Sequence, residues 1–192
     1  MQKVNFKNLT TTELNEFISK AAEELTKRAN KSPRVITARK KVIEDAKSDL
    51  ENLKDSTMCD GYEVGSYATV PEYHINRKKR VVTVLLKGYR SGRIYAKGIA
   101  KCDPRDTFNE HIGKAIALYR ALSKKVPTKY LTVENPVEPE IGDIILTSYP
   151  EFENERIRVV KSMSEAMADD AAMLRSPVVK NFTFIVDDSK SA

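Results

Sequence analysis

The residues best suited to chemistry are a run of cations in the middle of the chain. Nine lysines and arginines lie between Arg77 and Lys101, and this stretch contains no aspartate or glutamate. Cations on one face of a strand lie about 7 Å apart and could follow a phosphate backbone, while tyrosines among them could stack on unpaired bases. We therefore predict a non-enzymatic protein that binds DNA or RNA without sequence specificity. The predicted contact residues are Arg77, Lys78, Lys79, Arg80, Lys87, Tyr89, Arg90, Arg93, Tyr95, Lys97 and Lys101.

Two other interpretations of the sequence involve no nucleic acid. Lysines and arginines on an exposed sheet prevent strand edges from aggregating. Alternatively, the protein is an interaction protein that binds a host protein or forms a subunit of a larger complex. In that case the contact surface would come from the N-terminal helices and the acidic C-terminal region.

Residue patterns typical of enzymes and metal sites are absent from the sequence. The cysteines and histidines are Cys59, Cys102, His74 and His111, and no two of them have a metal-ligand spacing. A Cys102/His111 nucleophile pair would lack a third, orienting group. The sequence contains no glycine-rich nucleotide-binding motif and no hydrolase nucleophile motif. We therefore predict no catalytic residue, no metal and no cofactor.

Composition sets the size and the expected location of the protein. Its 192 residues, 41% of them hydrophobic, are enough for one moderate domain or two small ones. There is no apolar run of about 18 residues, and the first residues lack the apolar core of a signal peptide. We expect a cytoplasmic protein with free thiols and no membrane contact, located in the host cytoplasm if a phage encodes it.

The net charge of +6 is unevenly distributed. Residues 77–101 carry nine basic and no acidic groups, whereas residues 134–192 carry six basic and twelve acidic ones. The C-terminal region could therefore fold against the basic stretch or repel the same partner.

Residues 1–56 are predicted to form a helical hairpin. Apolar residues recur at helical spacing near 11–30, and Ser32 followed by Pro33 starts a second helix. The second helix could mediate homodimerisation, pack against the rest of the chain, or project as a small helical domain. The predicted oligomerisation residues are Ile36, Ile43, Leu50 and Leu53.

A linker is predicted at 57–76, because Gly61, Gly65 and Pro71 interrupt the periodicity there. It would contain at most a short strand around Tyr67–Val70. Residues 131–192 are predicted to form an acidic α/β segment, either a separate sheet or an extension of the central one. Its strand candidates are Asp143–Tyr149, Arg156–Lys161 and Pro177–Val186. A short helix bearing Met163, Met167, Ala171 and Leu174 separates the last two, and Asp187–Ala192 is expected to fray.

Residues 77–130 are predicted to be a β-β-α unit. Val81–Leu86 and Ile94–Cys102 form a hairpin, and small residues alternate on one face of the second strand, where a helix could approach closely. Thr107 is predicted as the N-cap of that helix, in a capping box with Glu110. The helix is expected to stop before Pro127.

This unit resembles a small uncharacterised domain family of bacteria and bacteriophages over about residues 80–125. The resemblance rests on Gly98, Ala100, Pro104, Asp106, Ile112, Gly113, Ala117, Arg120, Ala121, Leu122 and Ser123. It implies a fold like that of the double-stranded-RNA-binding domain (dsRBD), an antiparallel sheet covered by helices. True double-stranded-RNA binders begin their second helix with a basic cluster, whereas the predicted helix here begins with Thr107, Phe108, Asn109 and Glu110. We therefore expect an α+β fold with a helical hairpin, a dsRBD-like centre and an acidic C-terminal segment.

Overall fold

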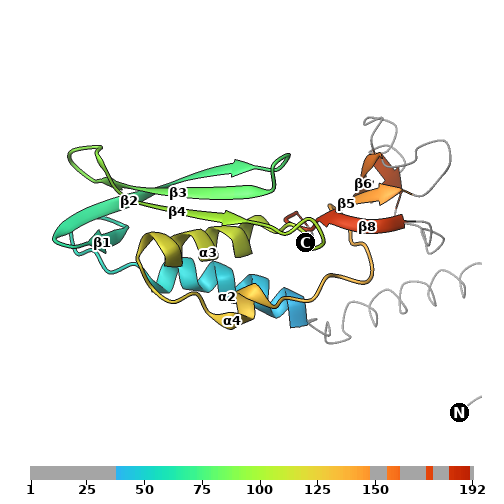
Figure 1. Cartoon of the computed structure of the whole chain (residues 1–192), viewed down its shortest axis with the longest axis horizontal. Coiled ribbons are helices and arrows are strands. Elements are labelled where there is room, and N and C mark those ends of the chain that lie inside the picture. The colour runs from blue at the N-terminus through green and yellow to red at the C-terminus, as the bar shows by residue number, and fades with distance from the viewer. Residues whose placement is uncertain (1–37, 148–154, 161–171, 175–181, 191–192) are drawn as a thin grey trace, which may run out of the picture. The chain divides into compact units, whose positions relative to one another are not determined.

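The structure, a computed structural model, describes residues 38–147, 155–160, 172–174 and 182–190. The chain divides into two compact units, 1–36 and 37–192, and all described residues belong to the second. The first predicted helix, Ile36, and the residues 161–171 predicted to be helical lie outside the described residues. The described part confirms a mixed α+β fold (Figure 1). None of its helices is long and apolar enough to cross a bilayer.

The first sheet is a four-stranded antiparallel meander in the order β1-β2-β3-β4. Its strands are β1 (Tyr62–Val64), β2 (Tyr67–Asn76), β3 (Val81–Gly88) and β4 (Ile94–Lys101). The β3–β4 hairpin confirms the prediction for this stretch. The prediction of a linker at 57–76 is wrong, because most of that segment forms β1 and the ten-residue β2.

Gly65 and Pro71 are both compatible with paired strands in this segment, for two different physical reasons. Gly65 adopts a φ of 62° and makes the tight turn between β1 and β2, so it marks a hairpin and not a linker. Pro71 pairs with Leu86 of β3 but lies beyond the residues of β2 that β1 covers. A proline is tolerated there because one edge of the strand is unpaired.

Helix α3 (Glu110–Ala121) packs closely against β3 and β4. A Cβ atom built on Gly98 would lie 1.9 Å from the carbonyl oxygen of Ala117, so only glycine permits this approach. Val82, Leu86 and Leu118 are fully buried between helix and sheet. The alternation predicted for β4, with small residues toward a helix, is confirmed from Ala96 to Lys101. It is wrong for Ile94, which pairs with Lys87 across a register shift and is 56% exposed.

The start of α3 differs from the prediction. Asn109 is the N-cap, and its side chain accepts hydrogen bonds from the backbone N–H groups of His111 (3.0 Å) and Ile112 (3.2 Å). The predicted Thr107 capping box is wrong, because the Thr107 hydroxyl instead donates to the carbonyl of Ile185, 2.7 Å away. A contact 78 residues away in the sequence has displaced the local signal.

Helix α2 (Ala38–Asn52) and the short α4 (Thr128–Leu131) lie with α3 on one side of the first sheet (Figure 1). Ala46 is fully buried against Ile112 and Ala115 of α3. The hydroxyls of Tyr119 and Tyr130 both donate to the Asp49 carboxylate, at 2.9 and 2.5 Å. These contacts attach α2 to the helices that follow it.

The predicted oligomerisation residues of α2 and its C-terminal end face the interior of the same chain. Leu50 and Leu53 pack against the core beneath the first sheet, and Ile43 packs against the cluster around Ala46. Of the alternatives for this helix, the placement favours packing within the chain.

The second sheet has the order β7-β6-β5-β8. Its strands are β5 (Ile144–Thr147), β6 (Arg156–Val160), β7 (Ala172–Leu174) and β8 (Phe182–Asp187). All pairs are antiparallel except β6 with β7. The C-terminal region therefore forms a separate sheet, one of the two predicted alternatives. Leu174, predicted in a helix, lies in strand β7.

The end of β8 and the residue after it bind the segment before α3 and helix α2. The Phe108 N–H donates to the Val186 carbonyl (2.9 Å), and the Asp188 N–H donates to the Phe108 carbonyl (3.1 Å). Arg39 is 8% exposed and binds both oxygens of the Asp188 carboxylate, at 2.5 and 3.1 Å. The prediction that Asp187–Ala192 frays is wrong for Asp187 and Asp188, which are 7% and 5% exposed because these bonds hold them.

Candidate nucleic-acid interface

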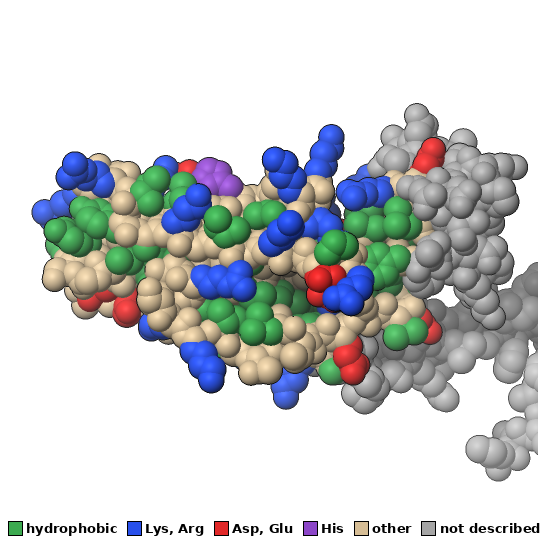
Figure 2. All heavy atoms as spheres, viewed as in Figure 1, with side chains coloured by type: hydrophobic (Ala, Val, Ile, Leu, Met, Phe, Trp, Pro, Cys, Tyr) green, Lys and Arg blue, Asp and Glu red, His purple; other side chains and the backbone are tan. Residues whose placement is uncertain are grey.

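The basic stretch occupies two turns at opposite ends of β3. Residues 77–80 join β2 to β3, and residues 89–93 join β3 to β4. The eight residues of β3 separate the turns by about 25 Å, at roughly 3.3 Å per residue. Figure 2 shows lysine and arginine side chains at both ends of this sheet. The two groups of cations cannot therefore contact the same phosphate.

Arg77, at the first turn, is held by internal partners. One guanidinium nitrogen donates to Asp187, and the other donates to Glu110 at 2.5 Å. The side chain is 40% exposed, whereas those of Asp187 and Glu110 are 9% and 17% exposed. Arg77 thus neutralises two poorly solvated carboxylates and fastens β8 and α3 to the turn.

Arg80 is also committed to the fold. Its guanidinium donates to the carbonyls of Pro104 (2.8 Å) and Asp106, and to the Cys102 sulfur at 3.2 Å. Its backbone φ of 56° turns the chain into β3. These bonds fix the 103–106 turn that leads to α3.

Lys87 and Tyr95 have partners on the first sheet itself. Lys87 lies 2.5 Å from Glu72, and this hydrogen bond is the main cause that lowers the pKa of the Glu72 carboxyl. Tyr95 stacks on Tyr67, with ring centroids 4.3 Å apart and planes 24° apart. The pair forms an aromatic surface beside the second turn, and Tyr67 is still 54% exposed.

The remaining predicted cations are exposed, and within the described ranges no ion pair or hydrogen bond engages their side chains. They are Lys78 and Lys79 at the first turn, Arg90 and Arg93 at the second, and Lys97 and Lys101 on β4. Tyr89, also at the second turn, is 57% exposed.

Strand β4 continues the cations of the second turn toward the first turn, because Lys101 at its end pairs with Val81. Lys97 and Lys101 point away from α3, and Ile99 lies between them with 44% of its side chain exposed. Arg93, Lys97 and Lys101 follow one another at four-residue intervals, about 13 Å apart along a strand. β4 is an edge strand, and its register shifts just before Lys97. Tyr95, at this shift, stacks on Tyr67, which shares its strand face with the buried Thr69. We call Tyr89, Arg90, Arg93, Tyr95, Lys97 and Lys101, together with Tyr67, the β4 surface.

Sequence reasoning missed Tyr67 in this surface. The residue lies in the segment interpreted as a linker, so no register connected it to β4. The turn at Gly65 was the available signal, because a hairpin there starts β2 at Tyr67.

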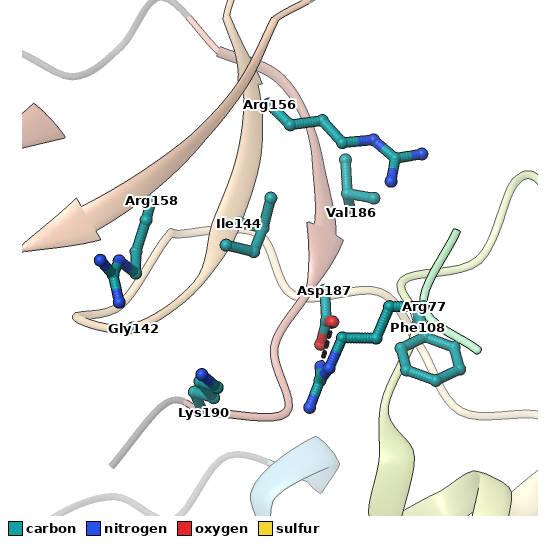
Figure 3. Close-up of a pocket in the computed structure, with 9 residues that line it drawn as sticks. All are labelled: Arg77, Phe108, Gly142, Ile144, Arg156, Arg158, Val186, Asp187 and Lys190. Carbon is teal, nitrogen blue, oxygen red and sulfur yellow. Dashed lines mark hydrogen bonds and ion pairs between the residues drawn. The ribbon is translucent and has the colours of Figure 1, made fainter. Parts of the chain in front are cut away.

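A cavity of about 380 Å³ lies beside the second sheet, and none of the residues of the β4 surface lines it (Figure 3). Its cations include Arg156 and Arg158, two residues apart on β6. The alternation Arg-Ile-Arg-Val was the sequence signal, since it places both arginines on the same strand face.

The cysteines and histidines are not gathered into a metal site in the part of the chain that the structure describes. Cys59 and Cys102 are free thiols. Burial raises the pKa of the Cys102 thiol, although Arg80 opposes this effect. Burial lowers the pKa of His111, as do the nearby Lys47 and Lys114.

No protein-family model, curated protein or solved structure matches this chain.

Proposed function

We propose that the protein binds nucleic acid through the β4 surface, without sequence specificity. The observation that supports this most is the sorting of the basic stretch into two classes. Arg77, Arg80 and Lys87 have internal partners, whereas the other six cations have none among the described residues, and four of these six, Arg90, Arg93, Lys97 and Lys101, belong to the β4 surface. Cations that a fold leaves exposed and in line suit a polyanion.

Phosphate contact supplies the affinity in this proposal. Each lysine or arginine that neutralises a phosphate releases a condensed counterion, so binding weakens as the salt concentration rises. Tyr89 is exposed at the turn and can stack on an unpaired base, as can the outer face of Tyr67. Stacking tolerates any base, which agrees with the absence of sequence specificity.

We further propose that the arrangement is dsRBD-like. In chain order, α2 comes first, the antiparallel sheet follows and α3 comes last, with α2 packed against α3. Both helices lie on one side of the sheet, and its other face is open (Figure 1). In this interpretation, α2 belongs to the domain that 77–130 was predicted to form alone.

The test is fluorescence anisotropy of labelled single-stranded and double-stranded DNA and RNA with the full chain. We expect binding at about 50 mM salt and a loss of affinity of about 100-fold or more in the double variant Arg90→Glu/Arg93→Glu, because each reversal replaces attraction by repulsion.

The matched control is Lys124→Glu/Lys125→Glu, which changes the net charge equally at exposed residues after α3. It should retain affinity within about fivefold, since only the long-range field changes. No binding to any of the four probes, or equal losses in both variants, would refute the proposal.

A further inference from the structure

The cavity beside the second sheet has the size of a small-molecule site. Its volume of about 380 Å³ falls within the range of roughly 300–1,000 Å³ that is typical of ligand pockets. Strands β5, β6 and β8 contribute residues to it, and so do the first turn and the segment before α3 (Figure 3). It is lined by Arg77, Phe108, Gly142, Ile144, Arg156, Arg158, Val186, Asp187 and Lys190.

Positive charge predominates in this lining. It contains four cationic side chains and one carboxylate, that of Asp187. One Asp187 oxygen binds Arg77, and the other accepts from the N–H (2.9 Å) and the hydroxyl (2.5 Å) of Ser189. The carboxylate is thus already engaged, while Arg156 and Lys190 are exposed. The cavity has the charge to attract an anion.

The floor of the cavity is apolar. Ile144 is half-buried, and Val186 and Phe108 are 6% and 3% exposed. In Figure 3, Ile144 lies at the centre with the cationic side chains around it. An inorganic anion would gain nothing from such a floor. A ligand with a flat apolar part and a negative group would use both features.

One wall is shaped by a glycine. Gly142 adopts a φ of 98°, and a Cβ atom there would lie 2.5 Å from the carbonyl oxygen of Lys190. The 142 turn and the chain at 190 therefore approach closely, which holds Lys190 beside β5. This close approach places a cation from the end of the chain in the lining.

We propose that this cavity binds a nucleotide, with its phosphate at Lys190 and its base against Ile144 and Val186, where the Arg156 guanidinium lies beside Val186 (Figure 3). The proposal does not depend on nucleic-acid binding by the β4 surface, because the two sets of residues do not overlap. The nucleotide could be free or could be the terminal nucleotide of a strand, since both present the same phosphate and base.

The test is isothermal titration of the full chain at low salt with AMP, adenosine and inorganic phosphate. AMP should bind more tightly than either fragment. Lys190→Ala should raise the dissociation constant for AMP about tenfold, as expected for the loss of a charge-assisted hydrogen bond. Arg156→Ala should raise it about threefold, because the guanidinium at the base end no longer contacts the aromatic ring. Lys124→Ala, which removes one exposed cation outside both proposed sites, should leave it unchanged.

A 5′-phosphorylated dinucleotide distinguishes the sources: affinity above that of AMP assigns the site to a strand end, and lower affinity assigns it to a free nucleotide. The proposal is overturned by millimolar AMP that does not bind, by phosphate binding as well as AMP, or by affinity that both pocket variants retain. Thermal melting of each variant shows that it is folded. These results are separate from the anisotropy assay, so either proposal can fail alone.

Discussion

The two turns that flank β3 each carry two arginines, and these arginines differ in what they contact. At the 77–80 turn, Arg77 and Arg80 bond to carboxylates and carbonyls of distant segments. At the 89–93 turn, Arg90 and Arg93 extend into solvent without a side-chain partner among the described residues. The comparison shows that a basic run is not a uniform surface. What the fold brings near each cation determines its role.

The difference has a topological cause. The first turn lies where α3 begins and β8 ends, so carboxylates from both elements meet the arginines there. The second turn lies at the other end of β3, about 25 Å away by strand length. Of the elements that the structure describes, none supplies it with a carboxylate. Arg77 and Arg80 at the first turn thus contribute to stability, whereas Arg90 and Arg93 at the second remain available for a ligand.

The largest expected effect is the loss of stability on removing Arg77. Arg77→Ala leaves Asp187 and Glu110 poorly solvated and without their cation, and we expect a loss of about 2 kcal/mol. For a chain of this size, that loss lowers the melting temperature by about 6 °C. Thermal unfolding followed by circular dichroism measures it.

The adjacent Lys78 is the control for this variant. It is exposed and lacks a side-chain partner in the described ranges, so Lys78→Ala should change stability by less than about 0.5 kcal/mol. Equal melting temperatures for the two variants would break the comparison, because Arg77 would then be no more structural than its neighbour.

A smaller expected effect is slow chemical modification of Cys102, which tests the packing around Arg80. Burial raises the pKa of Cys102 above the ordinary thiol value of about 9, so fewer thiolates form at about pH 8. In a Cys59→Ser variant, iodoacetamide should modify Cys102 several-fold more slowly in the folded protein than in urea. Equal rates would show that the thiol beneath Arg80 is not protected.

The same shift has a consequence for stability. The unfolded chain releases the Cys102 proton at a lower pH than the folded chain does. The free energy of unfolding should therefore fall as the pH rises past the ordinary thiol value. A denaturation series from about pH 8 upward, compared with Cys102→Ala, isolates this contribution.

The local elements of the fold could be predicted from the sequence. The apolar run Val81–Leu86, the glycines of the second turn and the small residues of β4 specify the hairpin and the helix on it, because neighbouring residues determine them. The β1–β2 hairpin was missed because Gly65 and Pro71 also suit a linker. The Asn109 cap was missed because Thr107 is held from Ile185, which local spacing does not show.

The β4 surface was predicted only in part, for the same physical reason. All its cations are visible in the sequence, but Arg77 and Arg80 look identical to them there. The partner Asp187 is 110 residues from Arg77 in sequence, so only the fold shows that this arginine is engaged. Composition can locate a charge, whereas the partner that neutralises it comes from tertiary structure.

The salt dependence of binding tests the central claim most directly. The measurement is the slope of log affinity against log salt concentration for the wild type and for Arg90→Ala/Arg93→Ala, on one labelled single strand. Removing two phosphate contacts should reduce the magnitude of the slope by about 1.4, at about 0.7 per contact. An unchanged slope in the variant would contradict the claim that the partner-free cations of the second turn bind phosphate.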